Sequence, residues 1–451
     1  MRTFLLNLPW QANGRLGVRA GSRWPFTSLP EKDGKIHYLP FPFFLGYTAS
    51  FLKKNSKEAK LLDCIAQNLD EEGLLKAILE FNPGLIFIET STPSFNNDIR
   101  IISRIKQGFS GVKIALGGPH AGFFSGQILK EYSFVDYILR GEYEHSLLDL
   151  VSSLEGSLDL EQAAGLIYRE GGTIKASKKI ATINDLDSLP WPEREEPVIY
   201  NYNDGFCGLP LPNVQIWSSR GCPFDCTFCL WPQTMYQGNK YRLRQPSKVL
   251  DEMAYLIDKY HFKAVYFDDD IFNADKNHVL GICSEMRKRS IKTPWAVMAR
   301  ADLMDQSLLE TMKDSGLYAI KYGIESASQK VLDLCKKRMD LSVASRMIKL
   351  TKELGIKVHL TFCLGLAGET RETINQTLDF IRNQRPDSFQ MSWATPLPGT
   401  EYYQSLESQG LLLSKDWSLY DGNYKYIIKN PDINALDIEE IKDAFNNNRN
   451  L

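Results

Sequence analysis

The stretch that decides the fold is "RGCPFDCTFCLWP", residues 220–232, which holds three cysteines in the spacing Cys222-x3-Cys226-x2-Cys229. Clustered thiolates are typical metal ligands, and a structural zinc site needs four protein ligands. Three thiolates are one short of that number, but they can hold a four-iron cluster and leave one iron open. We therefore interpret the stretch as an iron–sulfur site whose fourth ligand is a substrate or a cosubstrate.

The other cysteines leave one alternative open. Five of the eight are scattered, and a zinc site completed by the distant Cys207 or Cys363 is the simplest competing interpretation. No second C-x2-C pair and no Cys or His at zinc-finger distance supports it. One cluster among scattered cysteines is not the pattern of a secreted disulfide framework, and it suits a reducing cytosol with one metal site. The scattered cysteines are Cys64, Cys207, Cys283, Cys335 and Cys363.

Length, charge and hydropathy restrict the class of protein. The 451-residue chain has a formal net charge of −2 and is 43% hydrophobic. At roughly 150 residues per domain, the length predicts about three domains, or fewer if one is a barrel. The balanced charge gives no electrostatic reason to expect nucleic acid or an anionic membrane as partner. No apolar run approaches the ~20 residues of a membrane span, and "MRTFLLNLPW" (1–10) lacks a signal-peptide cleavage site. We expect a cytoplasmic protein.

The first 150 residues alternate between buried β-rich runs and helical segments, which predicts a doubly wound parallel sheet of Rossmann-like type. Ligands on such a sheet bind at the carboxyl ends of the strands. Here those ends carry "NLPW", "ETSTPS", "GGPH" and "RGEYEHS", which are small, polar or glycine-containing turns. The expected strands are 3–8, 59–64, 84–89, 112–118 and 135–140, with helices at 45–54, 71–81 and 96–107.

Residues 151–205 are predicted to be a linker. "GLIYREGGTIKAS" (165–177) is typical of a hairpin with Gly171-Gly172 at its turn. The proline-rich "LDSLPWPEREEP" (186–197) fits neither a long helix nor a central strand.

Residues 206–420 contain six further strand–helix units, three quarters of an eight-unit barrel. This predicts a partial (β/α)6 barrel of TIM type. The cysteine stretch follows its first strand and so lies at the carboxyl-terminal mouth, where such folds carry their active sites. We expect residues 421–451 to be an extension made of a strand and a short polar helix. The expected barrel strands are 213–219, 263–269, 294–299, 317–324, 356–365 and 387–393.

With these motifs in order, residues 210–415 resemble the radical S-adenosylmethionine (SAM) superfamily, whose signature is C-x3-C-x2-C. The resemblance implies that the three cysteines hold a [4Fe–4S] cluster that chelates SAM. It also implies SAM contacts at the strand ends. These are Phe228 near the adenine, Asp268 and Asp269 in "YFDDDIF" near the methionine end, Arg300 in "ARADL", Glu325 and Ser326 in "YGIESAS" near the ribose, and Gly365 in the adenine-side "GLAGET".

The N-terminal part resembles the cobalamin-binding domain that precedes some radical SAM barrels. The resemblance rests on "LGYTASFLKK" (45–54), "NPGLIFIETST" (82–92), "GGPHAGFF" (117–124), "VDYILRGEYE" (135–144) and "DLDSLPWP" (185–192). Glycines let backbone approach a bulky ring, and hydroxyl or carboxylate groups can hydrogen-bond to its amides or phosphate. The implied cobalamin contacts are Ser91, Thr92, Gly117, Gly118, Pro119, His120, Gly141 and Glu142.

One departure concerns the lower ligand of cobalt. Many cobalamin domains place a histidine in D-x-H-x-x-G, but "NLPWQANG" (7–14) has none and Ile65 stands at the corresponding place after the second strand. We therefore expect base-off cobalamin without a protein histidine on cobalt. His120 in "GGPH" is expected to contact the corrin edge or the tail, if it is not an ordinary loop histidine. The alternative is a relic domain that no longer binds cobalamin.

The combined resemblance implies a methyltransferase acting on an unactivated carbon of a small molecule or natural-product intermediate. In such enzymes a 5′-deoxyadenosyl radical abstracts hydrogen, methylcobalamin supplies the methyl group, and a second SAM restores it. A one-electron reductant such as flavodoxin or ferredoxin is the implied partner. The alternatives are oxidative cyclisation or rearrangement without methyl transfer, a non-enzymatic zinc-stabilised binding module, and sulfur insertion. Sulfur insertion usually needs a second cluster, for which no second cysteine triplet exists.

Overall fold

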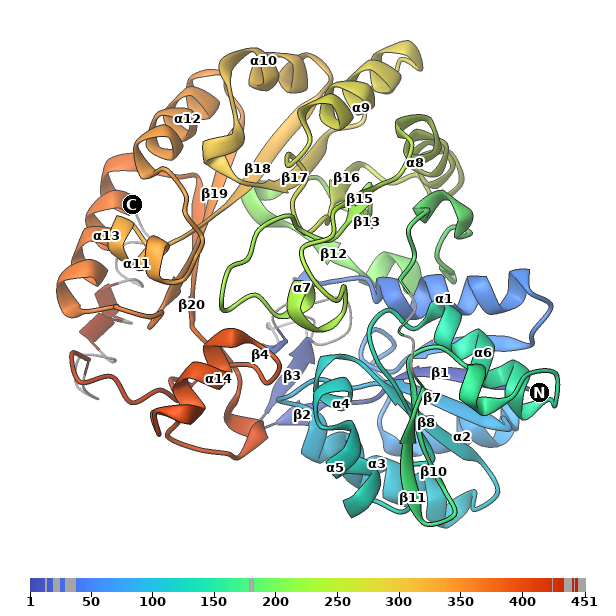
Figure 1. Cartoon of the computed structure of the whole chain (residues 1–451). Helices are drawn as coiled ribbons and strands as arrows, with labels where there is room; N and C mark the ends of the chain where they lie inside the picture. Colours follow the sequence, from blue (N-terminus) through green and yellow to red (C-terminus); the bar gives the residue numbers. More distant parts are fainter. Residues whose placement is uncertain are drawn as a thin grey trace.

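The computed structural model describes residues 1–12, 14–18, 25–28, 38–177, 180, 182–423, 425–433, 440–441 and 443–444. Two α/β units lie side by side in Figure 1, the N-terminal one in blue to teal and the second in green to orange. The first unit is built on a seven-stranded sheet in the order β11-β10-β9-β8-β7-β1-β6. Its parallel strands are β1 (Thr3–Asn7), β6 (Ala59–Asp63), β7 (Leu85–Glu89), β8 (Lys113–Gly117) and β9 (Tyr137–Leu139).

Both faces of this sheet are covered by helices, as predicted for a doubly wound fold. Leu5 of β1 packs in one core with α1 (Phe43–Lys54) and α6 (Glu144–Leu154). Phe4 and Leu6 face the opposite core, built with α2 (Glu71–Phe81), α3 (Phe95–Gly108) and α5 (Ser125–Glu131). Successive residues of one strand point to opposite faces, so its unbroken apolar run follows from burial on both sides.

The hairpin predicted around Gly171-Gly172 is present, but it is part of the sheet and not of a free linker. β10 (Leu166–Glu170) pairs antiparallel with β9, and β11 (Thr173–Ala176) pairs with β10. The sheet of the first unit therefore extends to residue 176, beyond the boundary predicted at residue 150. The hairpin covers the edge of β9, which would otherwise present unpaired backbone groups.

The second unit is a six-stranded parallel sheet in the order β13-β16-β17-β18-β19-β20, which confirms the six predicted strands. Among the described residues no pairing joins the edge strands β13 and β20. The strands are β13 (Asn213–Ile216), β16 (Ala264–Phe267), β17 (Trp295–Ala299), β18 (Leu317–Glu325), β19 (Lys357–Leu364) and β20 (Ser388–Trp393). The helices are α8 (Pro246–Tyr260), α9 (Lys276–Lys288), α10 (Gln306–Asp314), α11 (Gln329–Leu334), α12 (Leu341–Glu353) and α13 (Arg371–Gln384).

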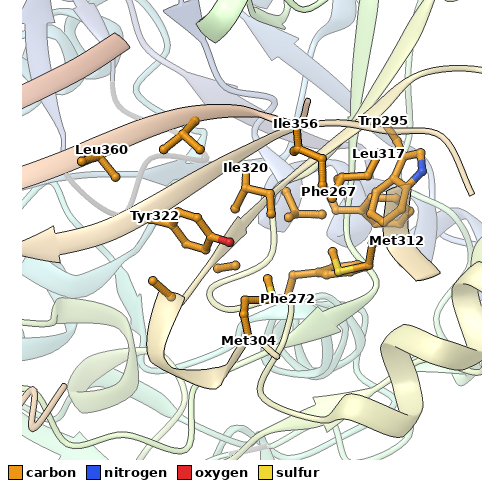
Figure 2. Packing of buried hydrophobic residues seen from close by; sticks show 14 of the residues in the cluster. Phe267, Phe272, Trp295, Met304, Met312, Leu317, Ile320, Tyr322, Ile356 and Leu360 are labelled. Carbon is orange, nitrogen blue, oxygen red and sulfur yellow. The ribbon is translucent and has the colours of Figure 1, made fainter. Parts of the chain in front are cut away.

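The main core of this unit lies between the strands and their covering helices (Figure 2). Trp295, Ile320 and Leu360 from three strands are fully buried and pack with Met312 of α10. The alternate residues of the same strands, among them Lys321, point into the lumen. Since β-strand side chains alternate between faces, the inner face is separate from this core, and on it Ala264, Ala296 and Ala319 form a small apolar cluster with Tyr266 and Leu209.

The N-terminal arm and the C-terminal segment meet beside the barrel. The three-stranded sheet β2 (Gln11–Ala12), β3 (Arg15–Val18) and β4 (Phe26–Ser28) follows β1, and the Thr27 amide donates to Asp421 Oδ2 at 2.8 Å. In the described part of 421–451 only isolated bridges are found in place of the predicted strand. Helical residues occur at 440–441 and 443–444, and much of the predicted helix lies outside the described residues.

None of the helices that the structure describes combines the length and the apolar character that a membrane crossing requires.

Candidate active site

The cysteine loop is held in a fixed shape by its two ends. Gly221 has φ +90°, and a Cβ there would lie 1.7 Å from the carbonyl oxygen of Lys240, so only glycine fits before the first cysteine. After the last cysteine, α7 (Leu230–Thr234) begins. Its Gln233 Nε2 donates to the carbonyl oxygens of Cys226, Thr227 and Cys229 at 3.3, 3.1 and 2.7 Å.

All three cysteines line one cavity of about 270 Å³ at the carboxyl ends of the barrel strands. Of the residues implied to bind SAM, three line the same cavity: Phe228, Arg300 and Glu325. The cavity also receives Phe26 and Tyr38 from the N-terminal arm. Thiols from the loop and polar groups from three strand ends thus converge on one space, as the motif order predicts.

Glu325 and Lys337 form a nearly buried ion pair in this cavity. Lys337 Nζ lies 2.9 Å from Glu325 Oε1, and the two side chains are 8% and 16% exposed. Glu325 has φ +69°, uncommon for a residue other than glycine, at a register shift between β18 and β19. This backbone bend turns the last residue of the strand toward the cavity. Lys337 was not predicted, because it reaches the site from the turn after α11 and matches no local motif.

Arg300 is held by three groups. Its guanidinium lies 2.8 Å from Asp302 Oδ2, donates to the carbonyl oxygen of Lys337 at 2.9 Å, and stacks 4.0 Å from the ring centre of Phe224. Phe224 lies between the first two cysteines, so Arg300 fixes the loop as well as lining the cavity.

The three aspartates of the acidic run after β16 have different surroundings, and the SAM contacts of Asp268 and Asp269 stay predictions. Asp269 is fully buried and braces the end of β13, accepting hydrogen bonds from the Ser218 amide at 2.9 Å and the Ser219 hydroxyl at 2.7 Å. Burial raises the pKa of Asp269 to about 7. Asp268 is also buried, and neither residue lines the cavity, whereas Asp270 does. Asp270 Oδ2 accepts from the Gly221 amide at 3.0 Å and from the Tyr236 hydroxyl at 2.8 Å.

Two further predicted residues, Ser326 and Gly365, are not among the residues that line the cavity. Ser326 is fully buried, and its hydroxyl accepts from the Ser328 amide at 3.2 Å. Gly365 has φ +90°, and a Cβ there would lie 2.6 Å from the ring of Tyr426. Their contact with SAM stays a prediction.

The residues predicted for cobalamin lie at the carboxyl edge of the N-terminal sheet, with Ser91 and Thr92 after β7, the Gly117–His120 turn after β8 and Gly141 after β9. The Ser91 hydroxyl lies 2.9 Å from that of Ser94, and Thr92 Oγ1 lies 3.2 Å from His120 Nδ1. Each hydroxyl keeps further hydrogen-bonding capacity. This edge therefore offers the neutral donors and acceptors that fit an amide-rich cofactor.

The glycines of this edge are required by the fold itself. A Cβ at Gly117 would lie 2.5 Å from the ring of Phe87, and one at Gly118 would lie 2.5 Å from the carbonyl oxygen of Thr90. Gly141 has φ +73° and would approach Ile180 to 3.0 Å. Local packing thus explains the three glycines without a ligand.

His120 is 1% exposed and packs among aromatic rings, with centroids 4.3 Å from Phe95 and 5.3 Å from Trp417. Burial lowers its pKa to about 3, so the imidazole is neutral. Pro119 begins the short helix α4 (Pro119–Phe123). His120 is therefore an enclosed residue of the domain, and its predicted contact with the corrin is not tested by this arrangement.

Glu142 joins the two units. Its carboxylate lies 3.1 Å from Arg220 Nη1 and 2.6 Å from Arg242 Nη1, while Glu144 lies 2.6 Å from the same Arg220 atom. Arg220, Glu142 and Glu144 are at most 2% exposed. Glu142 thus forms ion pairs with the barrel, one of them with Arg220 two residues before Cys222, and its contact with cobalamin stays a prediction.

The three thiols fit an iron–sulfur cluster. Burial raises the pKa of Cys222 to about 12 and also raises that of Cys226. Thiolates are therefore costly in this cavity unless a bound cation stabilises them, as coordinated iron does. Within the described ranges no set of three or more His, Cys, Asp and Glu residues is arranged around a single metal ion. Cys363 lines the same cavity as the three cysteines, whereas Cys207 does not.

Two family models match the chain. The radical SAM superfamily model matches residues 218–381, and the B12 binding domain model matches residues 34–151. The first range holds the three cysteines and Glu325, and the second holds the predicted cobalamin residues up to Glu142.

Several curated proteins are similar over most of the chain. An uncharacterized methyltransferase of Pyrococcus horikoshii is 28% identical over 84% of this chain and 81% of its own. The anaerobic magnesium-protoporphyrin IX monomethyl ester cyclase of Rubrivivax gelatinosus is 28% identical over 90% of this chain and 72% of its own. The cytidylyl-2-hydroxyethylphosphonate methyltransferase of Streptomyces wedmorensis is 27% identical over 92% and 87%.

Solved structures share the fold. The methyltransferase TsrM of Kitasatospora setae, with tryptophan substrate and a SAM analogue bound, matches with TM-score 0.74 and 16% identity over 99% of this chain and 89% of its own. OxsB with aqua-cobalamin and SAM bound matches with TM-score 0.74 and 16% identity, over 100% and 71%. In a second OxsB structure the match covers 84% of this chain and about half, 52%, of that chain, with TM-score 0.67 and 20% identity.

We predict that alanine at Cys222, Cys226 or Cys229 removes the iron. Reconstituted wild-type protein should carry about four irons per chain, and two thiolates cannot hold the cluster. Cys283→Ala is the matched control, because Cys283 is buried in the barrel core and does not line the cavity. Iron and sulfide analysis checks this, and full iron content in Cys226→Ala would contradict the assignment.

We predict that Arg220→Met lowers the free energy of unfolding by about 3–5 kcal/mol, because it leaves the buried carboxylate of Glu144 without its ion-pair partner and removes one of the two arginines that pair with Glu142. Urea unfolding followed by circular dichroism measures the loss. Adding Glu144→Gln should recover part of it, since the unpaired charge is then removed. Arg2→Met is the control, because the Arg2–Glu58 pair is exposed and worth about 1 kcal/mol or less. Equal losses in Arg220→Met and Arg2→Met would contradict the role of the buried network.

Proposed function

We propose that this chain, which belongs to the cobalamin-dependent radical SAM enzymes, methylates a carbon atom of a small-molecule substrate. The observation that carries the proposal is similarity over nearly the whole chain to proteins named methyltransferases, at 28% and 27% identity. When bound, the cluster and SAM supply a carbon-centred radical, and cobalamin supplies a methyl group. The protein supplies binding, orientation and a cavity shielded from water.

The described residues have separate parts in this proposal. Cys222, Cys226 and Cys229 hold the cluster, and Gln233 keeps their loop in shape. Glu325 accepts hydrogen bonds from the ribose of SAM, and Lys337 keeps that carboxylate oriented. The substrate occupies the rest of the cavity, between the cluster loop and the arm residues Phe26 and Tyr38.

Cobalamin is proposed to bind in the base-off form at the carboxyl edge of the N-terminal sheet. Ser91, Thr92 and the backbone of the Gly117–Gly118 turn offer the hydrogen-bonding groups. His120 is enclosed and neutral and is not proposed as a cobalt ligand. A small one-electron carrier such as flavodoxin or ferredoxin is the proposed reductant.

Oxidative cyclisation is the second candidate. The cyclase of Rubrivivax gelatinosus is matched at the same 28% identity over 90% of this chain, so similarity alone does not separate the two reactions.

The mass of the product distinguishes these candidates. Reconstituted enzyme with cobalamin, a reductant and methyl-deuterated SAM is incubated with a metabolite extract and analysed by mass spectrometry. Methylation adds a trideuterated methyl group in place of hydrogen, whereas cyclisation adds no deuterium. Cys226→Ala should abolish the new product. A new product that contains no deuterium and is absent with Cys226→Ala would overturn methyl transfer and favour oxidative cyclisation.

We predict that Glu325→Gln weakens SAM binding by about ten- to a hundredfold, the effect of losing a charged hydrogen-bond acceptor worth ~1.5–3 kcal/mol. Iron content should not change, because Glu325 is not a cluster ligand. Glu401→Gln is the matched control, since Glu401 forms an exposed pair with Lys336 on the surface. Equilibrium dialysis with SAM measures the change, and unchanged affinity in Glu325→Gln would remove the ribose assignment.

We predict that cobalamin bound to the wild-type protein has a base-off absorption spectrum and that His120→Ala leaves this spectrum unchanged. The reason is that His120 is buried and its ring is enclosed by Phe95 and Trp417. A histidine-ligated spectrum that disappears in His120→Ala would contradict the proposal. Absence of binding in every oxidation state of cobalt would favour a domain that has lost its cofactor.

A further inference from the structure

The lower half of the barrel lumen carries its own set of polar side chains. The register of the last three strands aligns Lys321 of β18 with His359 of β19, and His359 with Ser388 of β20. The next level toward the mouth is Gly323, Thr361 and Gln390, which borders the cavity of the cluster. The level of Lys321 and His359 therefore lies one step deeper than the residues assigned to SAM.

A second cavity of about 760 Å³ opens at this level. This volume is in the range of small-molecule binding sites. Four of its lining residues also line the cavity of the cluster, namely Phe26, Tyr38, Lys321 and Gln390. The two cavities thus share a wall, and a molecule bound in one can extend toward the other.

The floor of the second cavity is fixed by the segment before β13. Lys321 Nζ lies 2.7 Å from Asp204 Oδ2. The Tyr318 hydroxyl donates to the carbonyl oxygen of Gly208 at 2.9 Å, and Lys357 Nζ donates to that of Cys207 at 3.2 Å. These bonds hold the floor from two strands, so the cavity belongs to the folded barrel and not to a loose loop.

His359 lines this cavity and carries a buried nitrogen without a hydrogen-bond partner among the described residues. The residue is 7% exposed, its Nδ1 lies 2.8 Å from the Ser388 hydroxyl, and its Nε2 has no hydrogen-bond partner among the described residues. Buried polar groups are nearly always hydrogen-bonded in native proteins. Burial, together with the charge of Lys321, lowers the pKa of His359 well below its usual value, so the ring is neutral. Its Nε2 donates or accepts, depending on the tautomer.

The surroundings of His359 favour an uncharged ligand. The charges of Lys321 and Asp204 cancel, so a charged ligand would leave an unbalanced charge in a partly buried space. Aromatic rings surround the pair, with Lys321 Nζ 4.6 Å from the centroid of Phe206 and 5.4 Å from that of Tyr38. Phe206 also packs edge-on against His359, with centroids 5.7 Å apart. This combination suits an apolar or aromatic body with one neutral hydrogen-bonding group.

We propose that the lower lumen is a second substrate-binding pocket, in which His359 Nε2 hydrogen-bonds a neutral hydroxyl, carbonyl or amide at the end of the substrate remote from the reacting carbon. Phe26 and Tyr38 contact the body of the same molecule where the two cavities meet. The substrate class is an elongated, uncharged, largely apolar molecule with a polar end. The inference rests on the proposed function for the identity of the bound molecule as a substrate, but the pocket itself can be tested without any turnover.

The test uses reconstituted full-length enzyme and three probes of one shape, 2-naphthol, naphthalene and 2-naphthoate, in anaerobic equilibrium dialysis. Wild-type protein should bind 2-naphthol more tightly than the other two. His359→Phe should lower the affinity for 2-naphthol by about fivefold, as expected for one neutral hydrogen bond, and leave naphthalene binding unchanged. His359→Gln, which retains hydrogen-bonding groups, should keep the preference for 2-naphthol.

Iron content and SAM binding report whether each variant is folded, and His261→Asn is the matched control because His261 is exposed at the end of α8. Equal affinity for 2-naphthol in wild type and in a folded His359→Phe would overturn the proposal. Tighter binding of 2-naphthoate in the wild type would overturn the uncharged ligand class. Neither result bears on the proposed methyl transfer, which is tested separately by the mass of the product.

Discussion

The arrangement of the two units depends on one buried cation. Arg220 lies two residues before Cys222, forms ion pairs with Glu142 and Glu144 of the N-terminal unit, and stacks 4.7 Å from the ring centre of Tyr47. A guanidinium is stable at 2% exposure only with charged and aromatic partners in place. The position of the N-terminal sheet and the position of the cluster loop are therefore coupled, because one side chain cannot be satisfied unless both are correct.

The repeating pattern was predictable because each element follows from local burial. All six barrel strands and both faces of the N-terminal sheet correspond to apolar runs with the expected period. The hairpin was located correctly, but its pairing with β9 was not predicted. Strand order depends on contacts between distant segments, and local sequence does not determine it. Phe228, Arg300 and Glu325 line the cavity. They could be identified from the sequence because each belongs to a motif at the end of a predicted strand or directly after it.

The contacts that the sequence did not reveal have a common physical cause. Asp269 and Asp270 are neighbours on the chain, but only the geometry of the turn decides which carboxylate braces β13 and which faces the cavity. Glu142 was predicted as a cobalamin contact because it follows the carboxyl end of a strand, and its ion pairs were not foreseen because Arg220 and Arg242 come from far along the chain. Lys337 and His359 likewise acquire their surroundings only from tertiary packing.

The three hydrogen bonds from Gln233 to the loop carbonyls have a consequence for cofactor assembly. A loop that is already ordered loses little conformational entropy when metal arrives, whereas a zinc finger must fold around its ion. Because the ordering contacts come from α7 and from Arg300, the apoprotein is preorganised to receive iron and sulfide. Loss of the cluster to oxygen would then leave a scaffold into which the metal can be inserted again without refolding the barrel.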